Sequence, residues 1–150
     1  MAGASPLRVL VVEDEALLLM QLETFLEESG HLVVGSAMSS GEAFRIGGER
    51  GANLALVDVH LTDGPTGVEV GQHLAQALGM AVVFMTANPR RIPEDFVGAI
   101  GVIAKPYTTH GLSSALRFLI GAVHRPPPLM PEPASLQLAP AFKERWRDPA

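Results

Sequence analysis

The sequence predicts a single α/β domain, in which a doubly wound parallel sheet carries helices on both faces. Short apolar runs rich in Val, Ile and Leu alternate with stretches of helical spacing along most of the chain. Strands buried on both faces give such continuous apolar runs, and their alternation with helices requires right-handed crossovers. A length of 150 residues with 47% hydrophobic content suits one ordinary domain.

Five apolar runs are expected to form the strands of this sheet. Each run is short and ends at polar or turn-forming residues, which is typical of a buried parallel strand. The predicted strands are residues 7–12, 32–35, 54–57, 81–85 and 100–104.

Helices are expected between the strands. The first covers residues 14–28 and is stopped by Gly30. Its apolar stripe has the spacing of one helical face and consists of Leu18, Leu22, Phe25 and Leu26. The third and fifth helices are expected over residues 67–78 and 108–124.

Cap signals mark the starts of the second and fourth helices. Ser39 and Glu42 have the spacing of a capping box, in which each residue satisfies a free backbone N–H at the helix start. Asn88 followed by Pro89 supplies an N-cap and a proline at the first helical position. A strand and a helix are therefore expected to repeat five times.

The composition changes at Arg125, where prolines become frequent. We predict a domain over residues 6–124 and a proline-rich tail over residues 125–150, flexible or partly helical. The stretch "AFKERWR" can form a short helix that presents Phe142 and Trp146, although a mobile tail is the preferred interpretation.

Charge and cysteine content exclude several classes of function. The chain has no cysteine, which removes disulfides, thiolate metal sites and cysteine nucleophiles. Its net charge of −5 argues against nucleic-acid binding as the main role. No apolar run is long enough to cross a bilayer, so a cytoplasmic protein without membrane contact is expected.

Polar residues follow the apolar runs at the carboxyl edge of the predicted sheet, where ligands bind in open parallel sheets. This edge should gather Glu13 and Asp14 after the first strand, Asp58 after the third, Thr86 after the fourth and Lys105 after the fifth. Any one of these acids alone is more often a cap or a turn former. Their joint occurrence predicts a functional site.

Three neighbouring carboxylates repel one another, and a divalent cation between them relieves that repulsion. The oxygen-rich set suits Mg²⁺, with Asp14 and Asp58 as direct ligands and Glu13 acting through water. A phosphoryl group at Asp58 would be neutralised by the cation and by Lys105, and the Thr86 hydroxyl would donate a hydrogen bond to it. Such a site can form an aspartyl phosphate.

The sequence resembles the response-regulator receiver domain of two-component signalling over roughly residues 6–124. The resemblance implies a flavodoxin-like sheet of order 2-1-3-4-5, with Asp58 as the acceptor of phosphate from a kinase histidine. It also implies Mg²⁺ ligation by Glu13 and Asp14, and by the backbone carbonyl of His60, with Thr86 and Lys105 contacting the phosphoryl group. The matching motifs are Val11-Val12-Glu13-Asp14-Glu15, Leu56-Val57-Asp58, Phe84-Met85-Thr86-Ala87 and Ala104-Lys105-Pro106-Tyr107.

Three features depart from the usual receiver pattern. Thr62 replaces a common proline, and Gly67 lies one residue later than the usual glycine, so the loop after Asp58 is one residue longer. Val102 stands where the switch aromatic is usual, and the short, proline-rich tail is not expected to form a DNA-binding domain. These features resemble single-domain receivers whose fourth strand ends in Phe-Ala-Thr, here Phe84-Met85-Thr86.

The leading hypothesis is a stand-alone receiver that accepts a phosphoryl group on Asp58 from a histidine kinase or phosphotransfer protein. It would catalyse only its own phosphorylation and dephosphorylation, and would signal to an unknown protein target, alone or as a homodimer. The alternative is a receiver-like interaction module with weak or no phosphorylation, which Val102 favours. A nucleotide-binding or hydrolytic enzyme lacks support, because no glycine-rich phosphate loop follows the first strand.

The first predicted helix also suggests a docking face. Ala16 and Met20 lie opposite its core stripe, and Leu17 and Leu19 flank that stripe. Exposed apolar residues there could receive the helix pair of a histidine kinase. Equally, the last helix or the tail could cover them.

Overall fold

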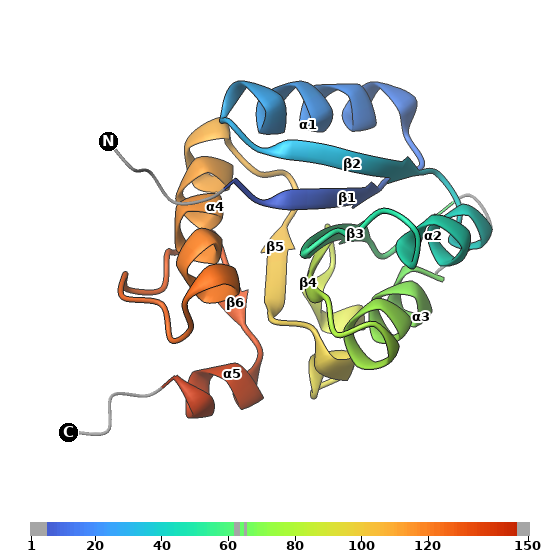
Figure 1. Cartoon of the computed structure of the whole chain (residues 1–150). Coiled ribbons are helices and arrows are strands. Elements are labelled where there is room, and N and C mark those ends of the chain that lie inside the picture. The colour runs from blue at the N-terminus through green and yellow to red at the C-terminus, as the bar shows by residue number, and fades with distance from the viewer. Residues whose placement is uncertain (1–5, 62–63, 65, 147–150) are drawn as a thin grey trace.

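A computed structural model describes residues 6–61, 64 and 66–146. The chain forms a six-stranded sheet of order β2-β1-β3-β4-β5-β6 (Figure 1). The first five strands are parallel in the predicted order 2-1-3-4-5, which confirms that part of the fold. The sixth strand, antiparallel to β5, was not predicted. The strands are β1 (Arg8–Val12), β2 (Leu32–Ala37), β3 (Leu54–Asp58), β4 (Ala81–Thr86), β5 (Gly101–Ala104) and β6 (Gln137–Leu138).

Helices cover both faces of the sheet (Figure 1). The helix α3 continues into a single π-helical turn, η1, and two short 3₁₀ turns, η2 and η3, follow β4. The bounds are α1 (Ala16–Glu28), α2 (Ser40–Gly47), α3 (Gly67–Gln72), η1 (His73–Ala77), η2 (Pro89–Arg91), η3 (Phe96–Gly98), α4 (Thr109–His124) and α5 (Pro140–Arg145). No helix of the described chain is long and apolar enough to cross a membrane.

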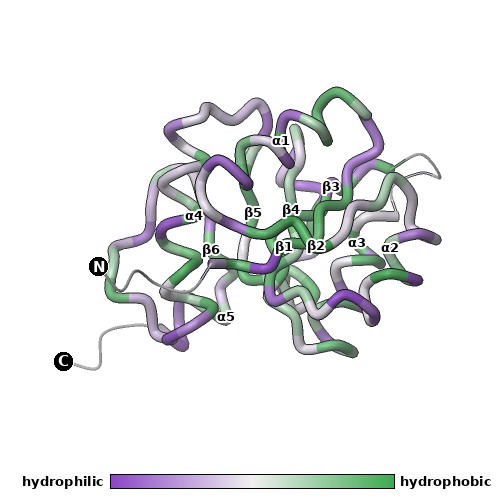
Figure 2. The backbone as a smooth tube through the Cα atoms, turned by 45° about the horizontal axis from the view of Figure 1, so that its top comes forward, coloured by the Kyte–Doolittle hydropathy of each residue, from purple (hydrophilic) through white to green (hydrophobic). Residues whose placement is uncertain are grey.

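Each strand divides its side chains between two hydrophobic clusters, because successive residues of a strand point to opposite faces. In β1, Val9 and Val11 pack with α1 and α4, whereas Leu10 and Val12 pack with α2 and α3. Figure 2 shows the hydrophobic residues concentrated on the central strands. Burial on both faces explains why these strands appear as continuous apolar runs in the sequence.

The apolar stripe of α1 differs slightly from the prediction. Leu22 and Leu26 are buried as expected, but Leu19 is also buried and Leu18 is only partly covered. The prediction that Leu19 flanks the core stripe was therefore wrong, because the helix is rotated toward that side. Leu17 remains exposed.

The predicted capping box at the start of α2 is present. The Ser39 hydroxyl accepts a hydrogen bond from the Glu42 N–H at 3.3 Å, and the Glu42 carboxylate accepts one from the Met38 N–H at 3.0 Å. Thr108 caps α4 in a similar way by accepting a bond from the Gly111 N–H. These bonds satisfy backbone donors that have no partner inside the helix.

The predicted fourth helix does not form. Asn88 makes no side-chain cap, and after η2 the backbone at Ile92 is extended. The physical reason is Pro93, since the residue before a proline is disfavoured in the helical region. Phe96 and Val97 then adopt left-handed backbone conformations, with φ of 54° and 45°. Two short 3₁₀ turns thus replace a helix between β4 and β5.

The segment after Arg125 folds back onto the sheet. Its proline-rich first part is largely exposed, with Leu129 98% exposed. Leu136, Leu138 and Ala139 are buried at β6, and α5 follows them. A short helix in the predicted stretch is thus present as α5.

His31 lies at the opposite end of the sheet from the acidic residues, and it is expected to make the stability of the fold depend on pH. Its Nδ1 accepts a hydrogen bond from the Leu7 N–H at 3.1 Å, and burial, with a contribution from His124, lowers the pKa of His31 below its ordinary 6.5. The unfolded chain therefore binds this proton more readily, so His31 stabilises the fold above pH 6.5 and loses that contribution as the pH falls. His31→Asn retains an acceptor that does not titrate. We expect melting temperature to fall less between pH 7 and pH 5 in this variant than in the wild type; equal losses would contradict the assignment.

Candidate functional site

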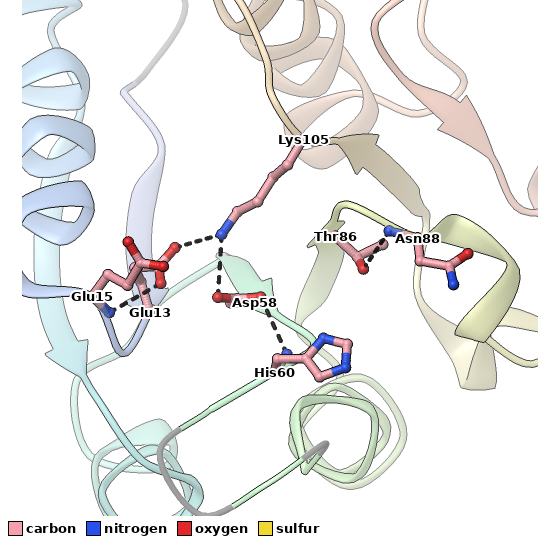
Figure 3. Close-up of polar contacts among 7 residues, drawn as sticks. All are labelled: Glu13, Glu15, Asp58, His60, Thr86, Asn88 and Lys105. Carbon is pink, nitrogen blue, oxygen red and sulfur yellow. Dashed lines mark hydrogen bonds and ion pairs between the residues drawn. The ribbon is translucent and has the colours of Figure 1, made fainter.

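Four predicted residues meet at the carboxyl edge of the sheet, each at or just after the end of a strand (Figure 3). Glu13 follows β1, Asp58 ends β3, Thr86 ends β4 and Lys105 follows β5. Glu13, Asp58 and Thr86 are buried, with 4%, 7% and 1% of their surface exposed. Parallel strands end at one edge, so residues distant in sequence come together there.

Lys105 joins two of the acids. Its Nζ lies 2.9 Å from Glu13 Oε1 and 3.2 Å from Asp58 Oδ2 (Figure 3). Burial on its own lowers the pKa of Lys105, but the hydrogen bond with Glu13 and the negative charge of Asp58 outweigh that effect, so the pKa is raised. The ammonium group therefore stays charged beside Asp58.

The three acids form a compact oxygen cluster. One carboxylate oxygen each from Glu13, Asp14 and Asp58 lies within 4.8 Å of the other two. The pKa of Asp14 is raised, first by burial and then by the hydrogen bond and charge of Glu13. Crowded acids of this kind are stabilised by a hard cation, and an all-oxygen donor set fits Mg²⁺ rather than a softer metal.

Backbone groups orient the acids. The His60 N–H donates to Asp58 Oδ1 at 3.2 Å, and the Glu15 N–H donates to Glu13 Oε2 at 3.1 Å (Figure 3). The imidazole of His60 is exposed and points away from the Asp58 carboxylate. The sequence did not reveal these donors, because any residue can supply a backbone N–H. Metal ligation by the His60 carbonyl stays a prediction.

Thr86 connects the site to the segment that follows β4. Its hydroxyl oxygen accepts a hydrogen bond from the Asn88 N–H at 3.0 Å (Figure 3). The hydroxyl proton remains available to donate to another acceptor. If another group accepted a hydrogen bond from this hydroxyl and moved it, the bond to the Asn88 N–H would transmit that movement to the backbone that leads into η2.

The loop after Asp58 is held against the end of β3. The Gly67 N–H donates to the Val59 carbonyl at 2.9 Å, and Leu61 and Gly64 exchange two backbone hydrogen bonds of 2.9 Å. A Cβ on Gly67 would lie 2.0 Å from the Asp58 carbonyl oxygen, so only glycine permits this approach. Thr62 lies outside the described residues, and the predicted extra loop residue stays a prediction.

Val102, which stands where an aromatic residue was expected, is packed in the hydrophobic core. Val102 is 2% exposed and belongs to the hydrophobic cluster that also contains Phe96 and Ala139. Tyr107 packs against the other cluster, on the α1 and α4 side of the sheet, and its pKa is raised mainly by burial. Tyr107 therefore does not replace a ring at Val102.

The fold is that of a receiver-type signalling domain with an acidic cluster at the carboxyl edge of its sheet, and comparison with known proteins agrees on the class. The family model for the response regulator receiver domain matches residues 9–117, and the chain belongs to this family.

Two curated relatives are regulators. The phyllosphere-induced regulator PhyR of Methylorubrum extorquens is 34% identical over 114 residues, which are 72% of this chain and 41% of PhyR. The transcriptional regulatory protein PdtaR of Mycobacterium tuberculosis is 30% identical over 124 residues, which are 79% of this chain and 58% of PdtaR. The matched region thus spans only about half the length of these relatives.

A solved structure supports the fold. The receiver domain of PhyR from Erythrobacter litoralis superimposes with a TM-score of 0.72 at 26% identity, covering 83% of this chain and 98% of that domain. The likeness therefore extends over a whole receiver domain.

Proposed function

We propose that Asp58 accepts a phosphoryl group from a phosphohistidine of a kinase or phosphotransfer protein, in a reaction that requires Mg²⁺, and that the phosphorylated chain signals through protein contacts. The observation that carries this proposal is the Asp58 carboxylate at a strand end, 3.2 Å from Lys105 Nζ and grouped with Glu13 and Asp14. Membership of the receiver family supports it. A cytoplasmic location follows from the proposed kinase partner.

In the proposed reaction, a carboxylate oxygen of Asp58 forms a bond to phosphorus as the bond between phosphorus and the donor imidazole nitrogen breaks. The imidazole keeps the electron pair. Lys105 offsets the negative charge of the transferred group, and the Thr86 hydroxyl donates a hydrogen bond to a phosphoryl oxygen. The domain catalyses only its own phosphorylation and dephosphorylation.

The cation would be held by Glu13, Asp14 and Asp58, and by the backbone carbonyl of His60. Mg²⁺ supplies positive charge that stabilises the phosphoryl oxygens during transfer. Among the described residues, Lys105 is the one cation that forms an ion pair with the three clustered acids. This imbalance supports a need for added positive charge.

Phosphorylation is tested by incubating the full chain with acetyl phosphate and Mg²⁺, and separately with candidate histidine kinases, followed by intact-mass measurement. We expect the mass of one phosphoryl group to appear, and to be absent when a chelator withholds Mg²⁺ from the start of the incubation. Failure of every donor to label the folded chain would overturn the proposal.

The alternative is a receiver-like module that signals with little or no phosphorylation, and the buried valine at position 102 is the observation that favours it. Calorimetric titration with Mg²⁺ separates the two. Binding in the millimolar range or tighter supports the phosphoacceptor, whereas absence of binding at these concentrations supports the module.

Docking of the phosphoryl donor is proposed on α1. A groove of about 590 Å³ runs between α1 and the start of α4, and Leu17, Met20 and Tyr107 lie along it. Leu17 and Met20 are 66% and 61% exposed, so α4 and the described part of the C-terminal segment, up to Trp146, do not cover them. An apolar groove beside the acceptor suits the helix pair of a kinase.

Met20→Glu should slow phosphotransfer from the kinase by about tenfold, because it places a charge in the proposed apolar contact. Labelling by acetyl phosphate should not change, since this small donor needs no docking. Leu129→Glu is the matched control, because Leu129 is 98% exposed outside the groove. Equal kinase rates for wild type and Met20→Glu would refute docking at this place.

A further inference from the structure

The outer edge of β5 is covered by the chain's own C-terminal segment. We name residues 135–146 the C-terminal cover. Its strand β6 runs antiparallel to β5, with Leu138 opposite Gly101 and Gln137 opposite Val102. The Ala139 N–H donates to the Ile100 carbonyl at 2.7 Å. The cover thus adds a strand to an edge that would otherwise present unpaired backbone groups.

Two glycines of the domain fit this cover closely. A Cβ on Gly101 would lie 2.4 Å from the Gln137 carbonyl oxygen, and one on Gly111 would lie 3.2 Å from Ser135 Cβ. The Ser135 hydroxyl also donates to the Gly111 carbonyl at 2.6 Å. Neither glycine has a positive φ, so the backbone conformation does not require them. At Gly101, the close approach of the Gln137 backbone does require glycine.

Side chains of the cover alternate between buried and exposed along β6. Leu136 and Leu138 are 1% and 6% exposed, whereas Gln137 between them is exposed. Beyond β6, the rings of Trp146 and Phe118 meet edge to face at 6.2 Å. The surface therefore accepts an extended apolar–polar–apolar segment followed by an aromatic residue.

The strand pairing between the cover and β5 is short. β6 is two residues long and pairs with only the first half of β5, so in the described part of the chain Ile103 and Ala104 pair with β4 but have no strand partner on the outer edge. The ion pair of Lys143 with Glu132, at 3.9 Å, connects the cover to the preceding segment and not to the sheet. That segment is largely exposed and rich in proline, which allows the cover to detach as a unit.

We call the surface of β5 and α4 that lies beneath the cover the β5 groove. We propose that this β5 groove is a docking site for an extended strand of a partner protein, and that the C-terminal cover competes with this partner in cis. The chemistry of the partner follows from the present occupant: two apolar residues separated by a polar one, added antiparallel to β5. The cover pairs with the first half of β5, and the same strand leads at its other end to Lys105. The proposal does not depend on phosphorylation of Asp58.

The test uses the full chain with Leu136→Asp and Leu138→Asp, which releases the cover and leaves the groove unaltered. The probe is a fluorescent peptide with the sequence of residues 134–146, and anisotropy reports its binding. We expect saturable binding to this opened chain, and binding at least about tenfold weaker to the wild type, whose tethered cover competes at high effective concentration. Failure of the opened, folded chain to bind the peptide would overturn the proposal.

Two controls locate the binding. A peptide carrying the same two aspartates should not bind, and Gly101→Val in the opened chain should weaken binding at least about tenfold, because the valine displaces the approaching carbonyl. Unaltered affinity in that variant would contradict docking on β5.

A second measurement does not require the opened chain. Trp146 is the only tryptophan, so its emission reports the position of the cover. Gly101→Val alone should shift that emission to longer wavelength as Trp146 becomes more exposed to water. An emission spectrum identical to that of the wild type would show that the cover is not seated at Gly101.

Discussion

Asp58→Asn is expected to abolish phosphoryl incorporation from both acetyl phosphate and a cognate kinase. The amide keeps the shape of the side chain and can still accept the bond that the His60 N–H donates to Asp58 at 3.2 Å. It is not a nucleophile toward phosphorus, so the new bond cannot form at this position. The measurement is intact mass after incubation with Mg²⁺ and each donor, where the variant should remain at its unmodified mass.

A matched control is Asp95→Asn, because Asp95 also accepts a backbone hydrogen bond, from the Val97 N–H at 3.0 Å, but lies outside the acidic cluster. This variant should be labelled like the wild type. Full labelling of Asp58→Asn would show that another residue is the acceptor, and the proposed function would fail in its central assignment.

Asp58→Asn should also weaken Mg²⁺ binding. Asp58 is one of the three carboxylates within 4.8 Å of one another, and asparagine leaves two charges where there were three. Calorimetry should show an affinity reduced by about tenfold or more, since each carboxylate contributes strongly to binding of a hard cation. An unaltered affinity would place the cation away from Asp58.

The parallel strands and the site residues could be predicted from sequence because both depend on a simple rule. A strand buried on both faces must be apolar along its whole length, so its end is visible where the first polar residue appears. Glu13, Asp58, Thr86 and Lys105 are such residues, and the structure gathers them at one edge. Their partners in the backbone, such as the His60 N–H, carry no sequence signal.

The segment after β4 shows why local signals were insufficient. Asn88 and Pro89 do begin a helical turn, but Pro93 keeps Ile92 extended. The left-handed Val97 is held by a distant residue, because Gln76 Nε2 donates to its carbonyl at 3.0 Å. A contact between residues so far apart cannot be inferred from the spacing of residues within the segment.

The C-terminal segment shows a different difficulty. Its composition is that of a linker, and the many prolines correctly describe the exposed stretch that begins at Arg125. Only a few residues, from Leu136 to Ala139, provide the buried contact with the sheet. An apolar run this short is too weak a signal to identify a strand. Its position against the sheet also depends on Gly101, which is far away in the sequence.

Gly67→Ala is expected to lower the free energy of unfolding substantially. The added Cβ would lie 2.0 Å from the Asp58 carbonyl oxygen and 2.6 Å from Val59 Cα. Both atoms belong to the backbone of the acceptor strand and the residue after it, so no side-chain rotation relieves the overlap. We expect the free energy of unfolding, measured by chemical denaturation, to fall by about 3 kcal/mol.

Gly48→Ala is the matched control, because no atom lies within 4 Å of the position its Cβ would take. Its φ of −90° is also acceptable for alanine, so its stability should remain within about 0.5 kcal/mol of the wild type. The folded fraction of Gly67→Ala should in addition be phosphorylated more slowly, since moving α3 away from β3 weakens the 2.9 Å bond between the Gly67 N–H and the Val59 carbonyl. If Gly67→Ala were as stable and as rapidly labelled as Gly48→Ala, the loop after Asp58 would not be held against the acceptor strand by this contact.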